Sequence, residues 1–207
     1  MKILVAVPCL DMVNTDFAFS LACMHHGDGV SFAHTKSSLV YDGRNKLANL
    51  AINGGFDRVL WLDSDMKFEN DLLMKLSSDL DKGLDCVCGI YTTRQTDIHP
   101  VIFKEIGYRL NDKTGMATPV NEPFKEYPKD RVFQIEACGF GGVMMKASLL
   151  KEVKDKYGLP FSPILGFGED ISFCMRLKEL GKKMYCDPRV KLGHIGYKVY
   201  TEADINV

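Results

Sequence analysis

The segment Asp63-Ser64-Asp65 places two carboxylates one residue apart, directly after the apolar run 59–62. Two acidic side chains crowded at the end of a strand repel each other unless a cation lies between them. Oxygen ligands of this kind favour Mg²⁺ or Mn²⁺, and those ions favour phosphate oxygens as further ligands. The motif therefore indicates a divalent-metal site for a phosphorylated ligand, although a turn or a helix N-cap is an alternative interpretation.

A second acidic pair, Glu169-Asp170, follows Gly168 at the start of an amphipathic stretch that is predicted to be a helix. One interpretation is structural, with Asp170 as N-cap and Glu169 favouring the positive end of the helix dipole. That interpretation does not explain Phe167 between two glycines. A catalytic base requires a carboxylate on a rigid helix end with room for a substrate hydroxyl, and this segment meets that requirement.

Three further residues could bind a ligand. His194 is bracketed by Gly193 and Gly196, which leaves it accessible enough to bind a metal, although a lone histidine is more often a polar surface or core residue. Arg44 lies near the start of a predicted helix, where it could hold a phosphate or the polar edge of a base, or be an unpartnered surface arginine. Asp11 follows the first strand and could contact a ribose or a base, or form a turn.

Hydrophobic periodicity predicts that strands and helices alternate along the first half of the chain. The third strand ends at the Asp63-Ser64-Asp65 motif, and a strand-helix alternation of this kind implies a parallel, right-handed, doubly wound sheet. In such sheets ligands bind where the strands end at their carboxyl side. The predicted strands cover 2–8, 30–35, 59–62 and 85–91. A helix is predicted between each pair of successive strands. The second of these helices starts at an Asp42 N-cap and ends at 54–55, and the third covers 70–82.

The second half is less regular. Residues 92–131 are polar and rich in turn residues, with 101–103 as the only obvious strand. A late strand at 183–186 is expected to stop before Pro188, because proline cannot donate to a continuing ladder. The glycines between 139 and 142 permit a ligand to approach the backbone closely, or form a β-bulge. Strands are further predicted at 132–137 and 143–145 and a helix at 147–157.

Composition is that of an ordinary globular protein: 207 residues are 46% hydrophobic and 26% charged, with a formal net charge of −1. This balance provides no general electrostatic attraction to nucleic acids or membrane surfaces. No apolar run approaches the roughly 18 residues that span a bilayer, and the N-terminus does not resemble a signal peptide, so we expect a cytoplasmic protein without a membrane partner. Seven scattered cysteines are expected to be reduced core residues.

Taken together, the motifs resemble the GT-A class of nucleotide-sugar-dependent glycosyltransferases, particularly the glycosyltransferase family 2-like enzymes. The resemblance covers the chain from Lys2 to about Gly196 and rests on the order of the motifs along it. The acidic pair and late histidine are also similar to those of the β-1,4-galactosyltransferases, except that Ile171 stands where those enzymes have a further aspartate. The motifs, in order, are Val7-Pro8, Arg44-Asn45, Asp63-Ser64-Asp65, Gly139-Phe140-Gly141-Gly142, Gly168-Glu169-Asp170 and His194.

The resemblance implies a single α/β domain over 1–207 with a mostly parallel sheet and a smaller irregular second half. Residues 1–91 would bind the nucleotide and residues 92–207 the acceptor. Asp65 would be the direct ligand of Mn²⁺ or Mg²⁺, Asp63 would contact the metal or the ribose, and His194 would complete the metal site. Asp170 would be the catalytic base and Glu169 would orient the acceptor. Nucleotide contacts are implied for Pro8, Asp11, Arg44, Asp63, Ser64 and Asp65, and donor-sugar or acceptor contacts for Gly141, Gly142, Phe167 and Gly168.

The implied activity is metal-dependent transfer of a sugar from a UDP-linked donor to an acceptor hydroxyl, with inversion. The acceptor stays open between a saccharide, a protein side chain and a hydroxymethylated DNA base. Three alternatives have weaker support from the residues. A haloacid-dehalogenase-type phosphatase usually has threonine where this chain has Lys67. A sugar nucleotidyltransferase has a glycine-rich loop that is missing after Pro8. A non-catalytic nucleotide-sugar-binding module would bind metal and nucleotide but would never release nucleoside diphosphate.

Overall fold

The computed structural model of the chain describes residues 1–94 and 97–197. Its main element is an eight-stranded sheet with the order β2-β1-β3-β10-β5-β11-β4, and β8 pairs with β11 beside this path. A smaller sheet has the order β7-β6-β9. The strands are β1 (Ile3–Cys9), β2 (Val30–Lys36), β3 (Arg58–Leu62), β4 (Met66–Phe68), β5 (Cys86–Ile90), β6 (Ile102–Leu110), β7 (Ala117–Pro123), β8 (Phe133–Ile135), β9 (Ala137–Cys138), β10 (Gly142–Lys146) and β11 (Met184–His194).

Strands β2, β1, β3, β5 and β11 of the main sheet run in one direction. Strand β10 runs against its neighbours β3 and β5, and β4 and β8 run against β11. Helices cover both faces of this central sheet, so the predicted α/β class with a mostly parallel sheet is confirmed. The helices are α1 (Thr15–Ala22), α2 (Val40–Asn53), α3 (Leu72–Asp81), α4 (Ala147–Tyr157) and α5 (Glu169–Glu179).

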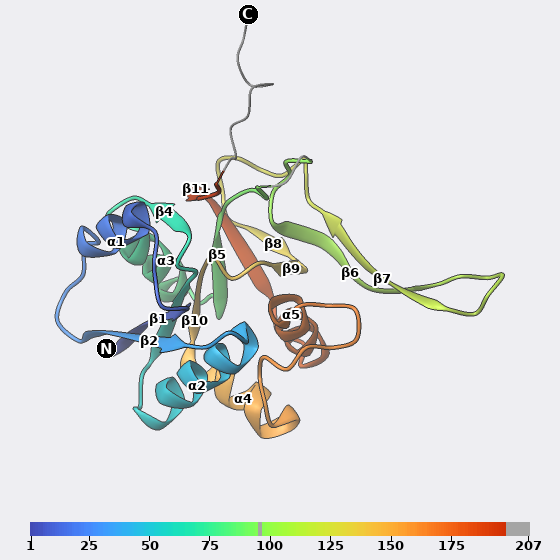
Figure 1. The fold of residues 1–207 in the computed structure, drawn as a ribbon, viewed down its shortest axis with the longest axis horizontal. Coiled ribbons are helices and arrows are strands. Elements are labelled where there is room, and N and C mark those ends of the chain that lie inside the picture. Colours follow the sequence, from blue (N-terminus) through green and yellow to red (C-terminus); the bar gives the residue numbers. More distant parts are fainter. Residues whose placement is uncertain (95–96, 198–207) are drawn as a thin grey trace, which may run out of the picture.

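Two apolar layers hold these helices on the sheet. One layer joins α2, α4 and α5 to one face and includes Leu47, Leu150 and Phe173, and the other joins α1 and α3 to the opposite face and includes Phe17 and Leu76. All five residues are at most 1% exposed. Figure 1 shows this arrangement, with α2 and α4 together on one side of the strands and α1 and α3 on the other.

Strand β3 carries the acidic motif into the middle of the molecule. All five of its residues are buried, and Trp61 is fully inaccessible to solvent. Its neighbours are β1 on one side and β10 on the other, so it lies among other strands rather than at an edge. Because β1 is parallel to β3, the carboxyl ends of both strands meet at the same edge of the sheet. This edge is where Asp63-Ser64-Asp65 emerges.

Two predictions about the second half are wrong. Residues 92–131 contain the β6–β7 hairpin, which Figure 1 shows extending away from the main sheet. The sequence of this hairpin does not alternate clearly between apolar and polar residues, because much of the hairpin is exposed on both faces. Strand β11 also continues past Pro188 to His194. Its register with β5 shifts between Cys186 and Lys191, so the hydrogen-bonded ladder is interrupted there and a proline is tolerated.

Two aspartates that were considered as N-caps, Asp42 and Asp170, lie inside the first turns of their helices. Helix α2 begins at Val40, so Asp42 is not its N-cap but lies in its first turn, 2.6 Å from the Lys46 ammonium. Helix α5 has Gly168 as its N-cap, which places Asp170 inside the first turn.

None of the helices in the described ranges is long and apolar enough to cross a membrane. All seven cysteines are free, and five are buried, as expected of reduced core residues, whereas Cys9 is partly exposed and Cys23 is exposed.

Candidate active site

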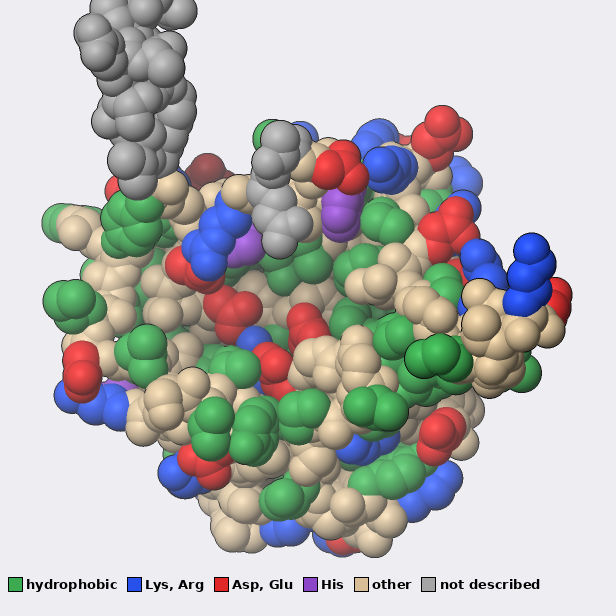
Figure 2. Space-filling view, turned by 45° about the vertical axis from the view of Figure 1, so that its right-hand side comes forward, with side chains coloured by type: hydrophobic (Ala, Val, Ile, Leu, Met, Phe, Trp, Pro, Cys, Tyr) green, Lys and Arg blue, Asp and Glu red, His purple; other side chains and the backbone are tan. Residues whose placement is uncertain are grey.

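A polar cleft of about 390 Å³ lies at the carboxyl edge of the main sheet. The ends of β1 and β3 form its floor, and the starts of α2 and α5 and the end of β11 form its walls. Figure 2 shows a hollow on this face with acidic side chains at its floor and histidine and basic side chains near its rim. The lining residues are Pro8, Cys9, Leu10, Thr35, Ser37, Ser38, Val40, Gly43, Arg44, Asp63, Ser64, Asp65, Tyr91, Arg94, Glu169, Asp170 and His194.

Arg44 is buried in the wall of this cleft and joins two acidic motifs. Its Nη2 atom donates to Asp63 Oδ1 at 2.7 Å, and its Nε atom donates to Glu169 Oε1 at 3.1 Å. The guanidinium lies 5.8 Å from the ring centroid of Trp61 and 5.2 Å from that of Phe140, so aromatic faces surround the charge. Burial lowers the pKa of Arg44, but the neighbouring carboxylates outweigh burial and raise it above its ordinary value.

Asp65 faces two side chains from distant parts of the chain. Its Oδ2 atom accepts a 2.6 Å hydrogen bond from Arg94 Nη1 and lies 3.5 Å from Nε2 of His194. Its backbone carbonyl accepts from the amide of Ile195 at 2.8 Å, which fixes the end of β11 beside the motif. The two aspartates of the motif therefore have different partners: Asp63 binds the buried Arg44, and Asp65 lies beside a histidine.

His194 is oriented by its second ring nitrogen. Nδ1 lies 2.9 Å from the carbonyl oxygen of Thr92, and because a carbonyl can only accept, Nδ1 carries the proton. The lone pair of neutral His194 is then on Nε2, the atom that lies near Asp65. The ring of Tyr91 packs edge-on against the imidazole at a centroid distance of 5.5 Å. A histidine held in this way by a backbone carbonyl has the arrangement of a metal ligand.

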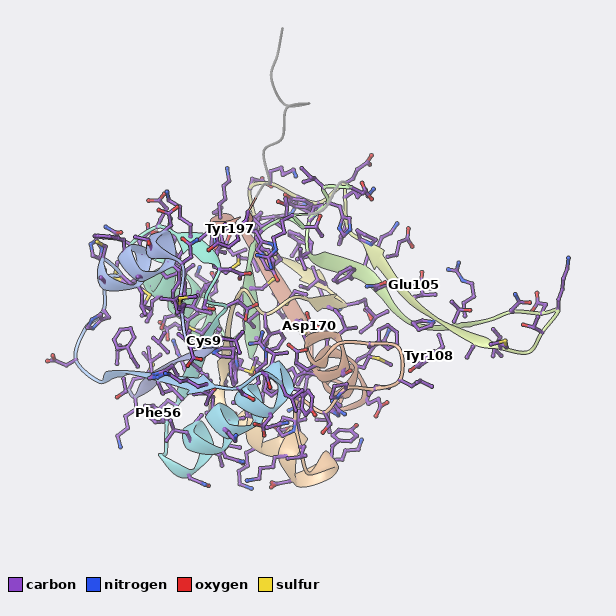
Figure 3. The ribbon with its side chains drawn as sticks, viewed as in Figure 1. Cys9, Phe56, Glu105, Tyr108, Asp170 and Tyr197 are labelled. Carbon is purple, nitrogen blue, oxygen red and sulfur yellow. The ribbon has the colours of Figure 1, made fainter. Side chains whose placement is uncertain are left out.

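Asp170 lies in the first turn of α5 and lines the same cleft. Figure 3 shows it at the start of the helix, toward the middle of the molecule. Burial and the adjacent Glu169 raise the pKa of Asp170 to about 6, although its bond with the Ile171 amide and the Arg44 charge act in the opposite direction. Gly168 leaves room for this carboxylate, because a Cβ atom there would lie 3.0 Å from Asp170 Oδ1. The result is a carboxyl group whose pKa suits proton transfer near neutral pH.

The donor set suits a hard divalent cation. Among residues 1–94 and 97–197, no group of three His, Cys, Asp or Glu side chains is gathered tightly enough to form a complete metal site. Asp65 and His194 supply one carboxylate oxygen and one oriented imidazole nitrogen. Asp63 is directed to Arg44 instead. A site with two protein ligands leaves coordination positions for phosphate oxygens and water, which is how Mg²⁺ is usually held in phosphate-binding sites.

The structure brings most of the predicted site residues together and leaves five outside the cleft. Asp11 lies on a neighbouring, more apolar pocket and pairs with Lys36 at 3.1 Å. Gly141 lies behind the lining residue Tyr91, because its amide donates to the Tyr91 hydroxyl at 3.3 Å. The other three, Gly142, Phe167 and Gly168, are not among the lining residues. Those that do line it are Pro8, Arg44, Asp63, Ser64, Asp65, Glu169, Asp170 and His194.

Sequence reasoning missed two cleft-lining side chains, Tyr91 and Arg94, that contact the acidic motif or its histidine. Tyr91 could have been found, because it closes the predicted strand 85–91 and strand ends line such clefts. Arg94 lies in a polar connection with no periodic pattern, and its contact with Asp65 spans 29 residues, so no local signal indicated it.

Comparison with known proteins identifies the fold. No protein-family model matches the chain, and no curated protein matches it. Among solved structures, it is similar to A197 from STIV, with 17% identity, coverage of 97% of each chain and a TM-score of 0.63. It is also similar to GalNAc-T7, which was solved with UDP, GalNAc and Mn²⁺, with 11% identity and a TM-score of 0.59. That match covers 96% of this chain and 43% of the other.

At these identities the likeness concerns the fold alone. The GalNAc-T7 match extends over 96% of this chain, whose mixed α/β sheet is consistent with a GT-A-like fold. The chain therefore has a GT-A-like fold.

Proposed function

We propose that this protein is a metal-dependent glycosyltransferase that moves a sugar from a nucleoside-diphosphate sugar, with UDP as the preferred nucleotide, to an acceptor hydroxyl. Its assignment to the family 2-like enzymes is part of the proposal and is supported by the order of the sequence motifs. The GT-A-like fold and a fold neighbour solved with UDP, GalNAc and Mn²⁺ support the donor class and the metal.

One observation carries the proposal. A carboxyl group with a pKa raised to about 6, Asp170, lines the same cleft as the Asp65–His194 pair. A phosphate-binding cation site alone would suit many nucleotide-binding proteins. A base with a raised pKa beside that site suits a reaction in which a hydroxyl must lose its proton as it attacks.

The nucleotide would occupy the part of the cleft between the ends of β1 and β2. Pro8 and Cys9 end β1, Thr35 pairs with Pro8 near the end of β2, and Ser37 and Ser38, which precede α2, line the same side. The diphosphate would then lie toward Asp65. Asp65 and His194 are the residues that would hold Mn²⁺ or Mg²⁺, which when bound neutralises the charge that develops on the leaving nucleoside diphosphate.

In the reaction that we propose, the acceptor oxygen forms a bond to the anomeric carbon while the bond from that carbon to the diphosphate oxygen breaks. The electron pair leaves with the nucleoside diphosphate, and the hydroxyl proton moves to the Asp170 carboxylate. Attack opposite the leaving group inverts the anomeric configuration. Arg44 binds Glu169 and Asp63 and holds both in place, whereas Asp170, whose pKa is raised to about 6, is the carboxylate of this group that is placed to accept the proton.

The acceptor would approach from the side of α5 and the β6–β7 hairpin. Tyr108 of the hairpin packs against Phe167 at a ring-centroid distance of 5.3 Å, and its hydroxyl donates to the carbonyl of Leu165. Figure 3 shows Tyr108 beside the loop that leads to Asp170. These contacts support the proposal that residues 92–207 bind the acceptor, with a saccharide, a protein side chain or a hydroxymethylated DNA base as candidate acceptors.

A screen of nucleotide sugars tests the proposal without a known acceptor. Purified protein is incubated with UDP-linked hexoses and N-acetylhexosamines in Mn²⁺ or in EDTA, and released UDP is measured. Because many transferases hydrolyse their donor slowly, we expect UDP release from one donor in Mn²⁺ and none in EDTA. Metal-dependent UDP binding without release from any donor, even after saccharides, peptides and hydroxymethylated DNA are added, would instead indicate a non-catalytic binding module.

A further inference from the structure

Arg94 occupies the carboxylate oxygen that a metal ion would need. Its Nη1 atom lies 2.6 Å from Asp65 Oδ2, the same oxygen that faces His194 Nε2 at 3.5 Å. The same Nη1 atom also donates to the carbonyl oxygen of Ile195 at 2.6 Å. The guanidinium therefore lies on the side of Asp65 that the histidine shares.

The backbone around this contact is shaped for the arginine. The Ile195 amide donates to the Asp65 carbonyl while the Ile195 carbonyl accepts from Arg94, so the three residues form a closed set of hydrogen bonds. A Cβ atom on Gly196 would lie 3.2 Å from Arg94 Cδ and 3.5 Å from its Cβ. Gly196 does not have a positive φ angle, so its backbone conformation does not require glycine. The missing side chain leaves space for the stem of Arg94.

Arg94 is nevertheless free to leave. Its side chain is 49% exposed, and that of Asp65 is 34% exposed, so the pair is open to solvent. An exposed ion pair contributes about 0–1 kcal/mol, which a divalent cation on the same carboxylate can exceed. A divalent cation on the same oxygen would be repelled by the positive charge of Arg94, so the two cations compete for Asp65.

We propose that Arg94 is a built-in competitor of the divalent metal: it neutralises Asp65 in the metal-free protein and must leave before Asp65 and His194 can bind the cation. The inference rests on the metal site of the proposed function and adds the residue that controls its occupancy. It implies that the metal alone binds weakly. Binding is strengthened when a diphosphate supplies further ligands together with the cation.

Titration with Mn²⁺ alone, followed by the electron paramagnetic resonance signal of free Mn²⁺, tests this competition. Arg94→Met keeps the apolar stem and removes the charge, and we expect it to raise Mn²⁺ affinity about two- to fivefold. Gly196→Ala crowds the stem without touching the charge and should act in the same direction. Arg94→Lys, which keeps a cation, should stay closer to the wild-type affinity. Arg109→Met is the matched control, because Arg109 is 71% exposed on the hairpin and lies outside the cleft lining.

Each outcome decides a separate claim. Equal or weaker Mn²⁺ affinity in Arg94→Met, in a protein whose wild type binds Mn²⁺ with UDP, overturns the competition and leaves the proposed function standing. Failure of every variant and the wild type to bind Mn²⁺, with or without UDP, overturns both the competition and the metal dependence of the proposed function. A rise in Arg94→Met that Arg109→Met does not share supports the competition.

Discussion

Asp63 accepts a 2.7 Å hydrogen bond from the buried guanidinium of Arg44, so the two aspartates of the Asp-Ser-Asp motif have different surroundings. The side chain of Arg44 is 2% exposed, and the same guanidinium also binds Glu169. Asp65 has instead a solvent-exposed arginine and a histidine as neighbours. We infer from this difference that Asp63 has a structural role and that Asp65 is the carboxylate that would hold a cation.

Substitution of the two aspartates should separate these roles. We expect Asp65→Asn to lower the affinity for UDP in Mn²⁺ by at least about tenfold, which corresponds to ~1.4 kcal/mol. Asp63→Asn should lower it less, because its carboxylate faces Arg44 rather than His194. Calorimetric titration with UDP, in Mn²⁺ and in EDTA, measures both effects. Equal UDP affinity with and without EDTA in the wild type would remove the metal from the site.

Replacement of Arg44 should destabilise the fold. Arg44→Met leaves the carboxylates of Asp63 and Glu169 without their buried partner, and breaking a buried pair in this way costs about 3–5 kcal/mol. Urea denaturation measures the change in the free energy of unfolding. Arg109→Met is the exposed control and should change it by less than about 0.5 kcal/mol. Equal stability of both variants would show that the Arg44 network is not structurally important.

Replacement of His194 should affect the metal without affecting the fold. Its side chain is 19% exposed and its polar contacts are those to Thr92 and Asp65, so His194→Ala should keep its melting temperature within a few degrees while Mn²⁺-dependent UDP binding weakens. His26→Ala, on an exposed residue outside the cleft lining, should leave both unchanged. A metal titration that is the same in His194→Ala and wild type would exclude the histidine as a ligand.

The raised pKa of Asp170 predicts a pH-dependent stability. The pKa of Asp170 is about 6 in the folded protein, whereas the ordinary value of an aspartate is 3.8. Protonated Asp170 therefore contributes a stabilisation of the folded state that is complete below about pH 4 and is lost as the pH rises through 6. Asp170→Asn cannot ionise and should be more stable than wild type at pH 8. Each pKa unit corresponds to about 1.4 kcal/mol, and partial exposure reduces the gain to about 1–3 kcal/mol. Melting curves at pH 4 and pH 8 should show a difference only at the higher pH.

The fold class could be predicted because the first half has strong local patterns. The apolar run before Asp63 becomes the fully buried strand β3, and the pattern of leucines at 72–80 becomes helix α3. The β6–β7 hairpin was missed because its exposed strands lack an apolar face. The end of β11 was misplaced because the effect of Pro188 depends on a register shift against a distant strand.

The site was predictable where its residues end a strand or start a helix. The acidic motif and Asp170 both lie at such positions, which local patterns reveal. Arg94 and its contact with Asp65 depend on the path of an irregular connection, so only the three-dimensional structure shows them. The burial of Arg44 is also a tertiary property, because the aromatic rings around it come from β3 and from the segment before β10.

The measurement that tests the central claim most directly is the rate of sugar transfer by Asp170→Asn, compared with wild type at pH 8 in saturating Mn²⁺. Asparagine preserves the shape of the side chain, so affinity for UDP and Mn²⁺ should stay near that of wild type. Because a positioned general base contributes about two to four orders of magnitude, transfer should fall by that factor. A near wild-type rate in Asp170→Asn would contradict the account and leave Glu169 or a retaining mechanism to be considered.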